Sequence, residues 1–272
     1  DVEIVLDKTP FYGESGGQTG DKGIISKSRV YDRADSLKVE VRDTKKFNEM
    51  QIHASVVKKG IIKTAMTVRA IVDENYRKSI KRNHTATHLL HAALRNVLGD
   101  HVKQAGSLVA SERLRFDFTH FYAMDNKELR EVEEIVSEKI IENLPVNISW
   151  TNLDDAIAKG VTALFGEKYG EKVRVVKAGD FTSELCGGSH CDATGEIGPF
   201  KIISEGSVAA GIRRLEAITG FTALEYIRTE EDELRKAANI LKVKELQVSE
   251  KLEKFVGDLK SQEKELEKAK SK

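Results

Sequence analysis

The amino-acid sequence predicts an α+β protein in three parts: a small β-barrel in residues 1–75, an α+β domain in residues 76–220, and a long helical, coiled-coil segment in residues 221–272. Short β-rich stretches separated by turn residues fill the first part. The second part mixes helices and strands without strict alternation, which is typical of α+β domains. Apolar residues spaced by seven run through the third part, which contains one glycine and no proline.

In the first part, several β-rich stretches alternate apolar and polar residues, as a small barrel with one solvated face requires. The expected strands are residues 4–6, 23–25, 37–41, 55–57 and 66–72. Between the first two, residues 11–21 contain four glycines, which permit positive φ and close backbone approach. The loop could therefore cradle a phosphate or a substrate. It matches neither GxGxxG nor GxxxxGK[ST], so an ordinary turn remains an equal alternative.

In the second part, the apolar spacing predicts a helix over residues 75–98 that ends at Gly99. A second amphipathic helix starts near Asp125 and ends before Pro145, and a short one opens at Asn152 or Asp154. The expected strands are residues 114–118, 146–150, 173–176, 200–203 and 213–218.

The third part is predicted to be one long helix. One apolar seam repeats every seven residues, and it consists of Ile227, Leu234, Leu241, Val248 and Phe255. A companion seam, Leu252, Leu259 and Leu266, is apolar only in the last three heptads. This pattern favours a coiled coil or helical hairpin, with a homodimer through residues 221–272 as one outcome. A helix lying back on the core is the alternative. The pattern stops in mid-heptad and an initiator Met is lacking, so a piece of a longer protein is expected.

The charge is balanced, with 44 Lys and Arg against 44 Asp and Glu. The balance holds within each of the three parts, which excludes a polycation that binds nucleic acid by bulk charge, though not a local basic patch. No run of 18 apolar residues and no signal-peptide pattern is present. The two cysteines, Cys186 and Cys191, cannot form a disulfide framework, so a reducing cytoplasmic compartment is expected.

Two histidines on the first long helix point to a metal. His84 and His88 are four residues apart, so their side chains stand on one helix face and could grip one divalent ion. The pattern is not the HExxH of metalloproteases, because Thr85 stands where the Glu would be. Such a pair on its own is usually incidental.

About 100 residues later, Cys186 and His190 are also four apart and are joined through a flexible Gly-Gly step. The combined His, His, Cys and His set suits Zn²⁺ best. Cys191 and His91 are alternative ligands, although Cys191 is better explained as a small buried hydrophobe. Spacing does not decide between a closed structural zinc site and an open catalytic one.

Several blocks around these residues resemble the editing domain of alanyl-tRNA synthetases. They are HTATHLLHAALR, VKQAGSLV, RLRFDFTHF and ELCGGSHCDATGEIGPFKIISEGSVAAGIRRLEAITG, in that order. TPFYGESGGQTGDKG is similar to the small β-barrel that precedes this domain, and the heptad segment is similar to the start of the helical oligomerisation region. The chain departs from the family at Ser189, often Thr, and at Cys191, often aliphatic; neither change removes an expected ligand.

The resemblance implies hydrolysis of serine or glycine wrongly esterified to tRNA for alanine. Such an activity is needed because a pocket for alanine excludes the smaller glycine, or an added hydroxyl, only weakly. By resemblance, Zn²⁺ is held by His84, His88, Cys186 and His190. Gln104, Thr87 and Ser107 are expected to line the catalytic pocket, and Arg213 is expected to bind the acceptor end of the tRNA. An amide such as Gln104 can orient substrate or water but cannot act as a base.

Each assignment has an ordinary structural alternative. Gln104 could be a surface loop residue, Thr87 a helix-packing residue, Ser107 a turn hydroxyl and Arg213 a solvated side chain. Arg214 points to the opposite face if this segment is a strand. Asp117 is a poor candidate base because the sequence offers it no partner. Arg77, Lys78, Lys81 and Arg82 form a basic group that could meet phosphates or simply face solvent. His53, His101 and His120 are isolated.

Two other functions compete with editing by a synthetase fragment. One is a tRNA-binding and dimerising module whose zinc is structural, and the other is a freestanding trans-editing deacylase. No ATP-binding loop or aminoacylation signature occurs, so this chain is not expected to charge tRNA.

Overall fold

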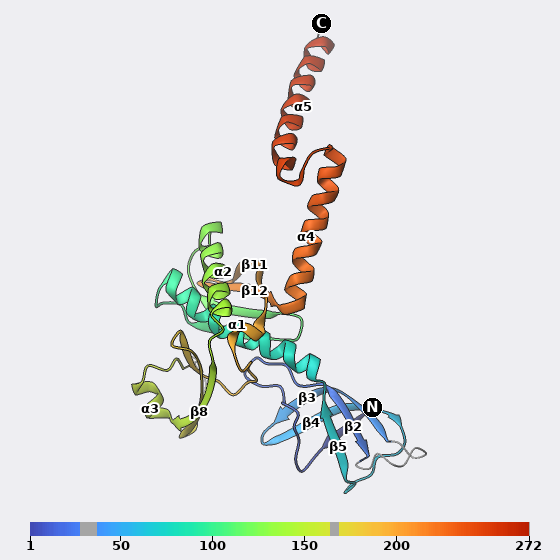
Figure 1. Ribbon diagram of the computed structural model, residues 1–272, viewed down its shortest axis with the longest axis vertical. Coiled ribbons are helices and arrows are strands. Elements are labelled where there is room, and N and C mark those ends of the chain that lie inside the picture. Colours follow the sequence, from blue (N-terminus) through green and yellow to red (C-terminus); the bar gives the residue numbers. More distant parts are fainter. Residues whose placement is uncertain (28–36, 164–168, 272) are drawn as a thin grey trace. The chain divides into compact units, whose positions relative to one another are not determined.

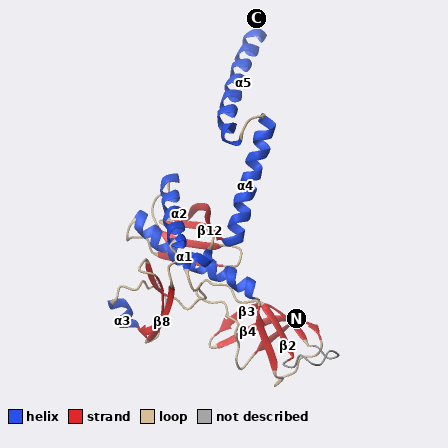
Figure 2. Ribbon diagram, viewed as in Figure 1, coloured by secondary structure: helices blue, strands red, loops and turns tan. Residues whose placement is uncertain are grey.

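The computed structural model describes residues 1–27, 37–163 and 169–271. These residues form two compact units, residues 1–222 and residues 223–272 (Figure 1). The first unit contains three sheets and most of the helices, and the second is helical (Figure 2). The mixed composition confirms the α+β class. The boundary near residue 75 stays a prediction, since both sides of it belong to the first unit.

The N-terminal sheet is antiparallel, and all five strands expected from the sequence are present. They are β1 (Val2–Val5), β2 (Gly23–Lys27), β3 (Lys38–Phe47), β4 (Met50–Lys59) and β5 (Val68–Val72), in the order β1-β4-β3-β2-β5. Side chains of both edge strands, including Ile4 and Val68, pack on a core around Ile25, Val39 and Val41. Among the described strands no ladder joins β1 to β5, so the sheet does not close into the expected barrel. The two edge strands are short, whereas closure needs paired strands around the whole circumference.

The second sheet contains the largest core of the chain. Its strands are β6 (Gln104–Val109), β7 (Leu114–Thr119), β11 (Phe200–Ala209) and β12 (Ile212–Thr219), in the order β11-β12-β7-β6. Helices α1 (Glu74–Leu98) and α2 (Asn126–Ile141) pack with this sheet around one core that includes Leu90, Phe116 and Leu215. Strand β6 was not expected from the sequence, because Gly106 interrupts its short alternation and a bulge falls between Gln104 and Gly106.

A third, smaller sheet contains β8 (Val146–Asn152), β9 (Lys172–Ala178) and β10 (Thr182–Leu185), in the order β10-β9-β8, next to the short helix α3 (Leu153–Ala158). Strand β10 was also missed, since it is only four residues long and ends directly before Cys186. A 3-10 helix, Thr194–Ile197, follows the segment 186–193 and contacts α1 and α2.

Helix α1 carries the first pair of expected metal ligands, and its ends are set by local chemistry. The side chain of Asp73 accepts a hydrogen bond from Tyr76 N and caps the first turn, and Gly99, at φ 108°, ends the last. Residues 83–91 are all buried. The histidines therefore face protein on every side, which makes a role as exposed helix-surface residues untenable.

The C-terminal segment differs from the single helix that was expected. Helix α4 (Gly220–Leu241) ends at Lys242, whose φ is 55°, and Val243 N donates to Ala238 O at 3.1 Å. A 3-10 turn, Glu245–Gln247, then leads into α5 (Val248–Lys270). The break buries Ala238 and Val248, which a straight isolated helix would expose. The sequence has no glycine or proline at this position, and the heptad pattern continues through it, so the break was not predicted.

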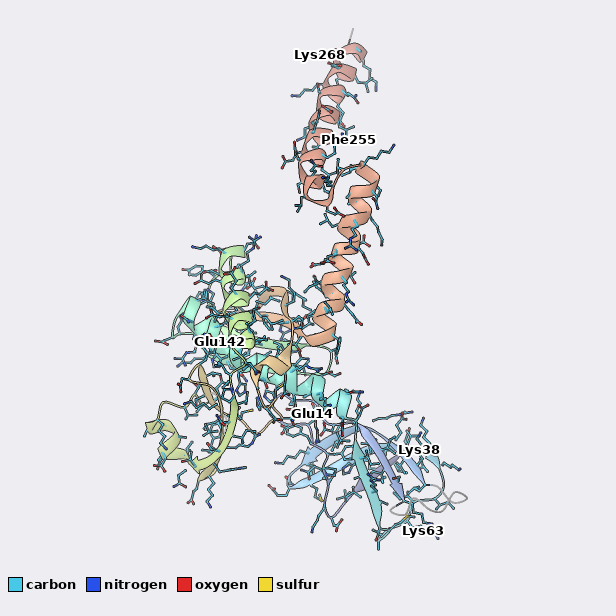
Figure 3. All side chains as sticks on the ribbon, viewed as in Figure 1. Glu14, Lys38, Lys63, Glu142, Phe255 and Lys268 are labelled. Carbon is cyan, nitrogen blue, oxygen red and sulfur yellow. The ribbon has the colours of Figure 1, made fainter. Side chains whose placement is uncertain are left out.

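Within the second unit, the apolar seam of α5 is not covered. Leu252, Phe255, Leu259 and Leu266 are each 44–57% exposed. Figure 3 shows side chains of this helix, including Phe255 and Lys268, standing away from the ribbon. Among the described residues, no helix is both long and apolar enough to cross a membrane.

Candidate metal centre

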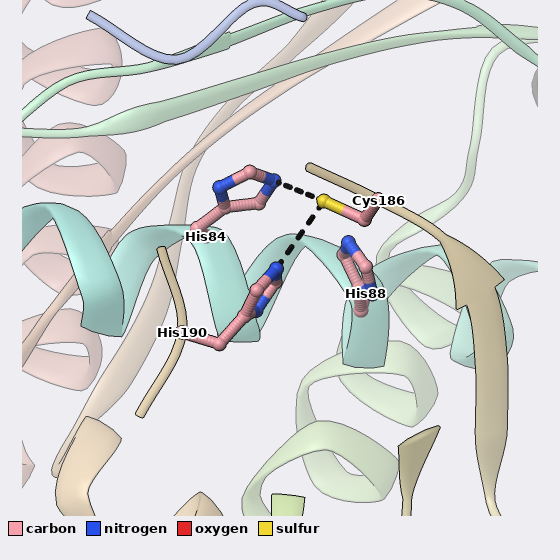
Figure 4. Close-up of side chains that lie close together, drawn as sticks. All are labelled: His84, His88, Cys186 and His190. Carbon is pink, nitrogen blue, oxygen red and sulfur yellow. Dashed lines mark hydrogen bonds between the residues drawn. The ribbon is translucent and has the colours of Figure 1, made fainter. Parts of the chain in front are cut away.

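Four side chains from two distant segments meet at one point. His84 and His88 come from consecutive turns of α1, and Cys186 and His190 come from the turn after β10 (Figure 4). The Cys186 Sγ atom lies 3.3 Å from His84 Nε2 and 3.3 Å from His190 Nε2. One donor atom from each residue lies within 4.8 Å of every other, and the three imidazoles are buried. The four expected ligands could therefore hold one metal ion.

The donor chemistry and spacing fit zinc. One thiolate and three imidazoles form a set that Zn²⁺ prefers, at bond lengths of about 2.3 Å to sulfur and about 2.0 Å to nitrogen. Donors around a tetrahedral ion are then roughly 3.3–3.8 Å apart. The 3.3 Å contacts of Cys186 Sγ already agree with this spacing. Cys191 and His91, the alternative ligands, are outside the group of four.

The 186–190 turn is shaped to approach helix α1 closely. A Cβ atom on Gly188 would lie 2.0 Å from His84 Cε1, so a larger residue does not fit. Arg174 in β9 stabilises the turn by donating hydrogen bonds to the carbonyls of Cys186 at 2.6 Å and Gly188 at 2.9 Å. The Gly188 N–H also points to Cys186 Sγ at 3.4 Å, which stabilises a thiolate.

The outward ring nitrogens of two histidines are hydrogen-bonded. His84 Nδ1 lies 2.7 Å from Oε1 of Gln18, a fully buried residue of the glycine-rich loop. His190 Nδ1 lies 3.2 Å from Thr85 Oγ1, which also accepts the Cys191 N–H at 3.0 Å. These contacts turn both Nε2 atoms toward the thiol sulfur, as a metal site requires.

Glu184 is a buried carboxylate between two histidines. Its oxygens lie 3.7 Å from His88 Nδ1 and 2.9 Å from His91 Nδ1. Burial would lower the pKa of His88, but the negative charges of Glu184 and Cys186 outweigh it and raise that pKa to about 9 in the metal-free protein. Burial would raise the pKa of Glu184, and the two histidines lower it. Glu184 and His91 also line a cavity of about 590 Å³ that none of the four ligands lines.

The two cysteines have opposite electrostatic surroundings. Burial opposes ionisation of Cys186, but His84 and hydrogen bonds from the surrounding imidazoles hold its pKa well below its usual range. Burial raises the pKa of Cys191 to about 11, and its side chain belongs to the apolar core. Cys186 is thus favoured as a thiolate, the form that could bind a metal, while Cys191 packs as the small hydrophobe that was expected.

The three residues expected to line a catalytic pocket lie on two different elements, β6 and α1. Gln104 and Ser107 lie on β6, where Gln104 Nε2 donates to Ser107 Oγ at 3.3 Å. Thr87 adjoins His88, but its hydroxyl donates to the Asn83 carbonyl at 2.8 Å. Among the described residues, none of the three has a hydrogen bond to a metal ligand. Their catalytic roles remain predictions.

The arginines of β12 are engaged in ion pairs. Arg213 forms two 2.6 Å hydrogen bonds to Glu205, and both side chains are largely buried. Arg214 pairs with Asp117 at 2.6 and 2.7 Å, which supplies the partner that the sequence did not reveal. Asp117 is therefore engaged by Arg214. The tRNA-binding role of Arg213 remains a prediction, and it would require the Arg213–Glu205 ion pair to open.

The basic group at the start of α1 is partly structural. Arg77 is paired with the buried Asp21, and Arg82 donates to the Glu196 carbonyl at 2.9 Å. Lys78 lies 3.9 Å from Glu74. Of the isolated histidines, His53 is fully buried, whereas His101 and His120 contact each other through ring nitrogens 2.9 Å apart.

Sequence reasoning missed the residues that support the ligands. Gln18, Thr85, Arg174 and Glu184 each contact a ligand or the ligand-bearing turn. The available signals were weak: Gln18 belonged to a glycine-rich loop that was equally well explained as a turn, and Glu184 is a single acidic residue two positions before Cys186.

Two family models match the chain. Residues 173–216 match the "Threonyl and Alanyl tRNA synthetase second additional domain", which covers the 186–190 turn. Residues 1–76 match "tRNA synthetases class II (A)", which covers the N-terminal sheet and the glycine-rich loop.

Curated relatives match along the whole sequence. The chain is 48% identical over 272 residues to an alanine–tRNA ligase of Thermoanaerobacter sp. (strain X514) and 49% identical over 272 residues to that of Acetivibrio thermocellus, with all of this chain covered in both. It is 49% identical over 269 residues to the alanine–tRNA ligase of Shewanella loihica, with 99% of this chain covered. In each case the chain spans 30% of the relative's length.

Proposed function

Because the chain belongs to the alanyl-tRNA synthetase family over the segment that it spans, we propose that it carries the post-transfer editing activity of such an enzyme. In this proposal it hydrolyses the ester that joins serine or glycine to tRNA for alanine, at a zinc site. The observation that carries the proposal is the cluster of His84, His88, Cys186 and His190, in which the three imidazoles are buried.

In the proposed reaction, the protein side chains orient the substrate and do not exchange protons with it. When bound, zinc would polarise the ester or lower the pKa of a water molecule. Gln104 would orient the ester or the attacking water through its amide, because an amide is no base. Its 3.3 Å contact to Ser107 brings the two polar side chains together on β6, which supports a role for both toward one ligand.

For the serine ester, discrimination against alanine in this proposal comes from polar groups that can pair with the serine hydroxyl. A site built to hydrogen-bond a hydroxyl rejects an analogue that lacks it, because its own polar groups are then left unpaired. Thr87 and Ser107 are the proposed readers of the hydroxyl. Arg213 would contact the acceptor end of the tRNA after exchanging Glu205 for a phosphate.

A purely structural zinc in a tRNA-binding module is the second candidate, and one observation favours it. Four protein donors are available, and the three histidines are at most 6% exposed, which resembles a closed structural site. Zinc content alone does not separate the two candidates, because both need the metal.

A deacylation assay on the full chain tests the proposal. The serine ester of tRNA for alanine should be hydrolysed roughly 100-fold faster than the alanine ester. Cys186→Ala should abolish stoichiometric zinc binding and lower the rate by at least about tenfold, because a thiolate ligand is lost. Cys191→Ala is the matched control and should retain both zinc and activity. Equal loss of the two esters would refute editing and leave the structural-zinc module.

A further inference from the structure

The amide of Gln18 connects the N-terminal segment to two parts of the candidate metal centre. Its Oε1 atom lies 2.7 Å from His84 Nδ1 and 2.8 Å from the backbone N of Ser189, and its Nε2 donates to Ser189 Oγ at 3.4 Å. The side chain is 0% exposed. A buried amide with both ends engaged holds one orientation, since any other leaves a polar group unpaired.

These contacts select the tautomer of the neutral His84 ring. The Ser189 N–H can only donate, so the Gln18 atom that accepts it must be the carbonyl oxygen. The same oxygen can only accept from His84, so His84 Nδ1 must carry a hydrogen. In the neutral ring the lone pair is then on Nε2, which lies 3.3 Å from Cys186 Sγ. Gln18 thus selects the tautomer that a metal needs.

The loop that carries Gln18 is fastened to the rest of the unit on both sides. Thr19 N donates to Val109 O at 3.0 Å, and Val109 N donates to Gly17 O at 2.7 Å, which joins the loop to β6. The buried Asp21 accepts the Tyr12 N–H at 2.6 Å and pairs with Arg77 of α1.

Glycines allow the close approach on either side of Gln18. A Cβ on Gly17, whose φ is 80°, would lie 2.5 Å from Ser107 Oγ. A Cβ on Gly188 would lie 2.8 Å from Gln18 Oε1. The glycine-rich loop therefore packs closely against both β6 and the 186–190 turn.

We propose that Gln18 is a positioning residue of the metal centre, through which the N-terminal segment sets the tautomer of His84 and the place of the 186–190 turn. The inference rests on the proposed metal site. It assigns the glycine-rich loop a role in metal affinity, in place of the phosphate or substrate cradle considered from the sequence.

Zinc affinity of the full chain, measured by chelator competition, tests this inference. Gln18→Met keeps the length of the side chain but removes the acceptor, and it should weaken zinc binding by about 10- to 100-fold. Gln18→Glu restores an acceptor oxygen and should recover most of that loss. Ser15→Ala is the control within the same loop: it removes the 2.8 Å contact to the Tyr12 hydroxyl and leaves the Gln18 contacts in place, so affinity should be unchanged.

A spectroscopic measurement separates positioning from general damage. In the zinc-loaded wild type, imidazole ¹⁵N NMR should show a protonated Nδ1 on His84, and Gln18→Met should shift this signal and make its proton exchange faster. Circular dichroism of the metal-free chains should be the same for wild type and Gln18→Met. If Gln18→Met does not fold, Gln18→Glu still tests the inference through its retained affinity and His84 signal.

The failure of this inference is distinct from the failure of the proposed function. A wild-type chain that binds no zinc would overturn the metal site itself, and the inference with it. A wild type that binds zinc, together with a Gln18→Met variant of unchanged affinity and unchanged His84 signal, would overturn the role of Gln18 alone.

Discussion

His53 and His88 are both buried histidines, but their surroundings move their pKa values in opposite directions. Burial lowers the pKa of His53, and the hydrogen bond to the Ile4 carbonyl offsets only part of that effect. For His88, the carboxylate of Glu184 and the thiolate of Cys186 more than offset burial. A buried charge is thus tolerated at the candidate metal centre and opposed in the N-terminal sheet.

At this scale, His53 makes the stability of the protein depend on pH. Its Nδ1 donates to Ile4 O at 2.8 Å, and its Nε2 lies 2.8 Å from the Thr9 hydroxyl, so both nitrogens are satisfied in the neutral ring. The folded-state pKa lies below the unfolded value of about 6.5. The unfolded chain therefore binds more protons as pH falls below about 6.5, and the free energy of unfolding decreases.

We expect the melting temperature of the wild type to fall more steeply between pH 7.5 and pH 5 than that of His53→Gln. The glutamine can still donate to the Ile4 carbonyl, but it does not titrate. The measurement is made on metal-free protein, so that zinc release does not contribute. Parallel curves for the two proteins would contradict the assignment.

Residue-level prediction from the sequence succeeded where chemistry and spacing were both distinctive. The four residues that meet at the candidate metal centre were predicted because a His–His pair and a Cys–His pair, each spaced by four residues, together offer a donor set that suits zinc. Gln18 and Glu184 were not found, because an amide or a single acid has no distinctive spacing, and Gln18 reaches His84 across 66 residues of sequence. Only the fold brings such partners together.

At the scale of elements, substitutions in the turn between β10 and the 3-10 helix can test how backbone shape controls the candidate metal centre. Two adjacent glycines differ completely in their surroundings. A Cβ on Gly188 would lie 2.0 Å from His84 Cε1 and 2.4 Å from its Nδ1, whereas a Cβ on Gly187 would meet nothing within 4 Å.

Gly188→Ala should therefore displace His84 or the turn and weaken zinc binding by about 10- to 100-fold. The same clash should destabilise the folded chain by about 1–3 kcal/mol. Gly187→Ala is the matched control and should bind zinc as the wild type does. Isothermal titration with zinc and thermal unfolding measure the two effects, and equal behaviour of both variants would show that the turn adapts freely.

Elements with a long, regular pattern were predicted well, and short or interrupted ones were not. Helix α1 was anticipated nearly to the residue, because its apolar stripe and its terminal glycine are local signals. The end of α4 at Lys242 was missed, since the burial of Ala238 and Val248 that accompanies the break is a property of the folded segment. The open edges of the N-terminal sheet depend in the same way on which strands pair.

For the whole molecule, the even charge distribution limits how nucleic acid could bind. Lys and Arg equal Asp and Glu in number over the full sequence, and several basic side chains, including Arg77 and Arg213, are already paired with acids. Under the proposed function, affinity for tRNA must then come from a few Lys and Arg side chains at defined positions and from binding of the aminoacylated end of the tRNA in the site. This affinity should decrease as the salt concentration increases.

Self-association of the whole chain is expected to depend on the C-terminal segment. Because α4 and α5 are separate helices, the heptads cannot form one continuous coiled coil along residues 221–272. The exposed seam of α5 remains, and a seam within one 23-residue helix supports only a weak, concentration-dependent dimer.

The mass measured by light scattering at increasing concentration should approach twice the 30.3 kDa mass of the chain. Phe255→Lys combined with Leu259→Lys places two charges in the seam and should keep the chain monomeric. The control, Gly257→Lys with Ser261→Lys, adds the same two charges away from the seam and should preserve the dimer. A wild type that stays at the monomer mass at every concentration would eliminate dimerisation through α5, and its exposed leucines would then need a different partner.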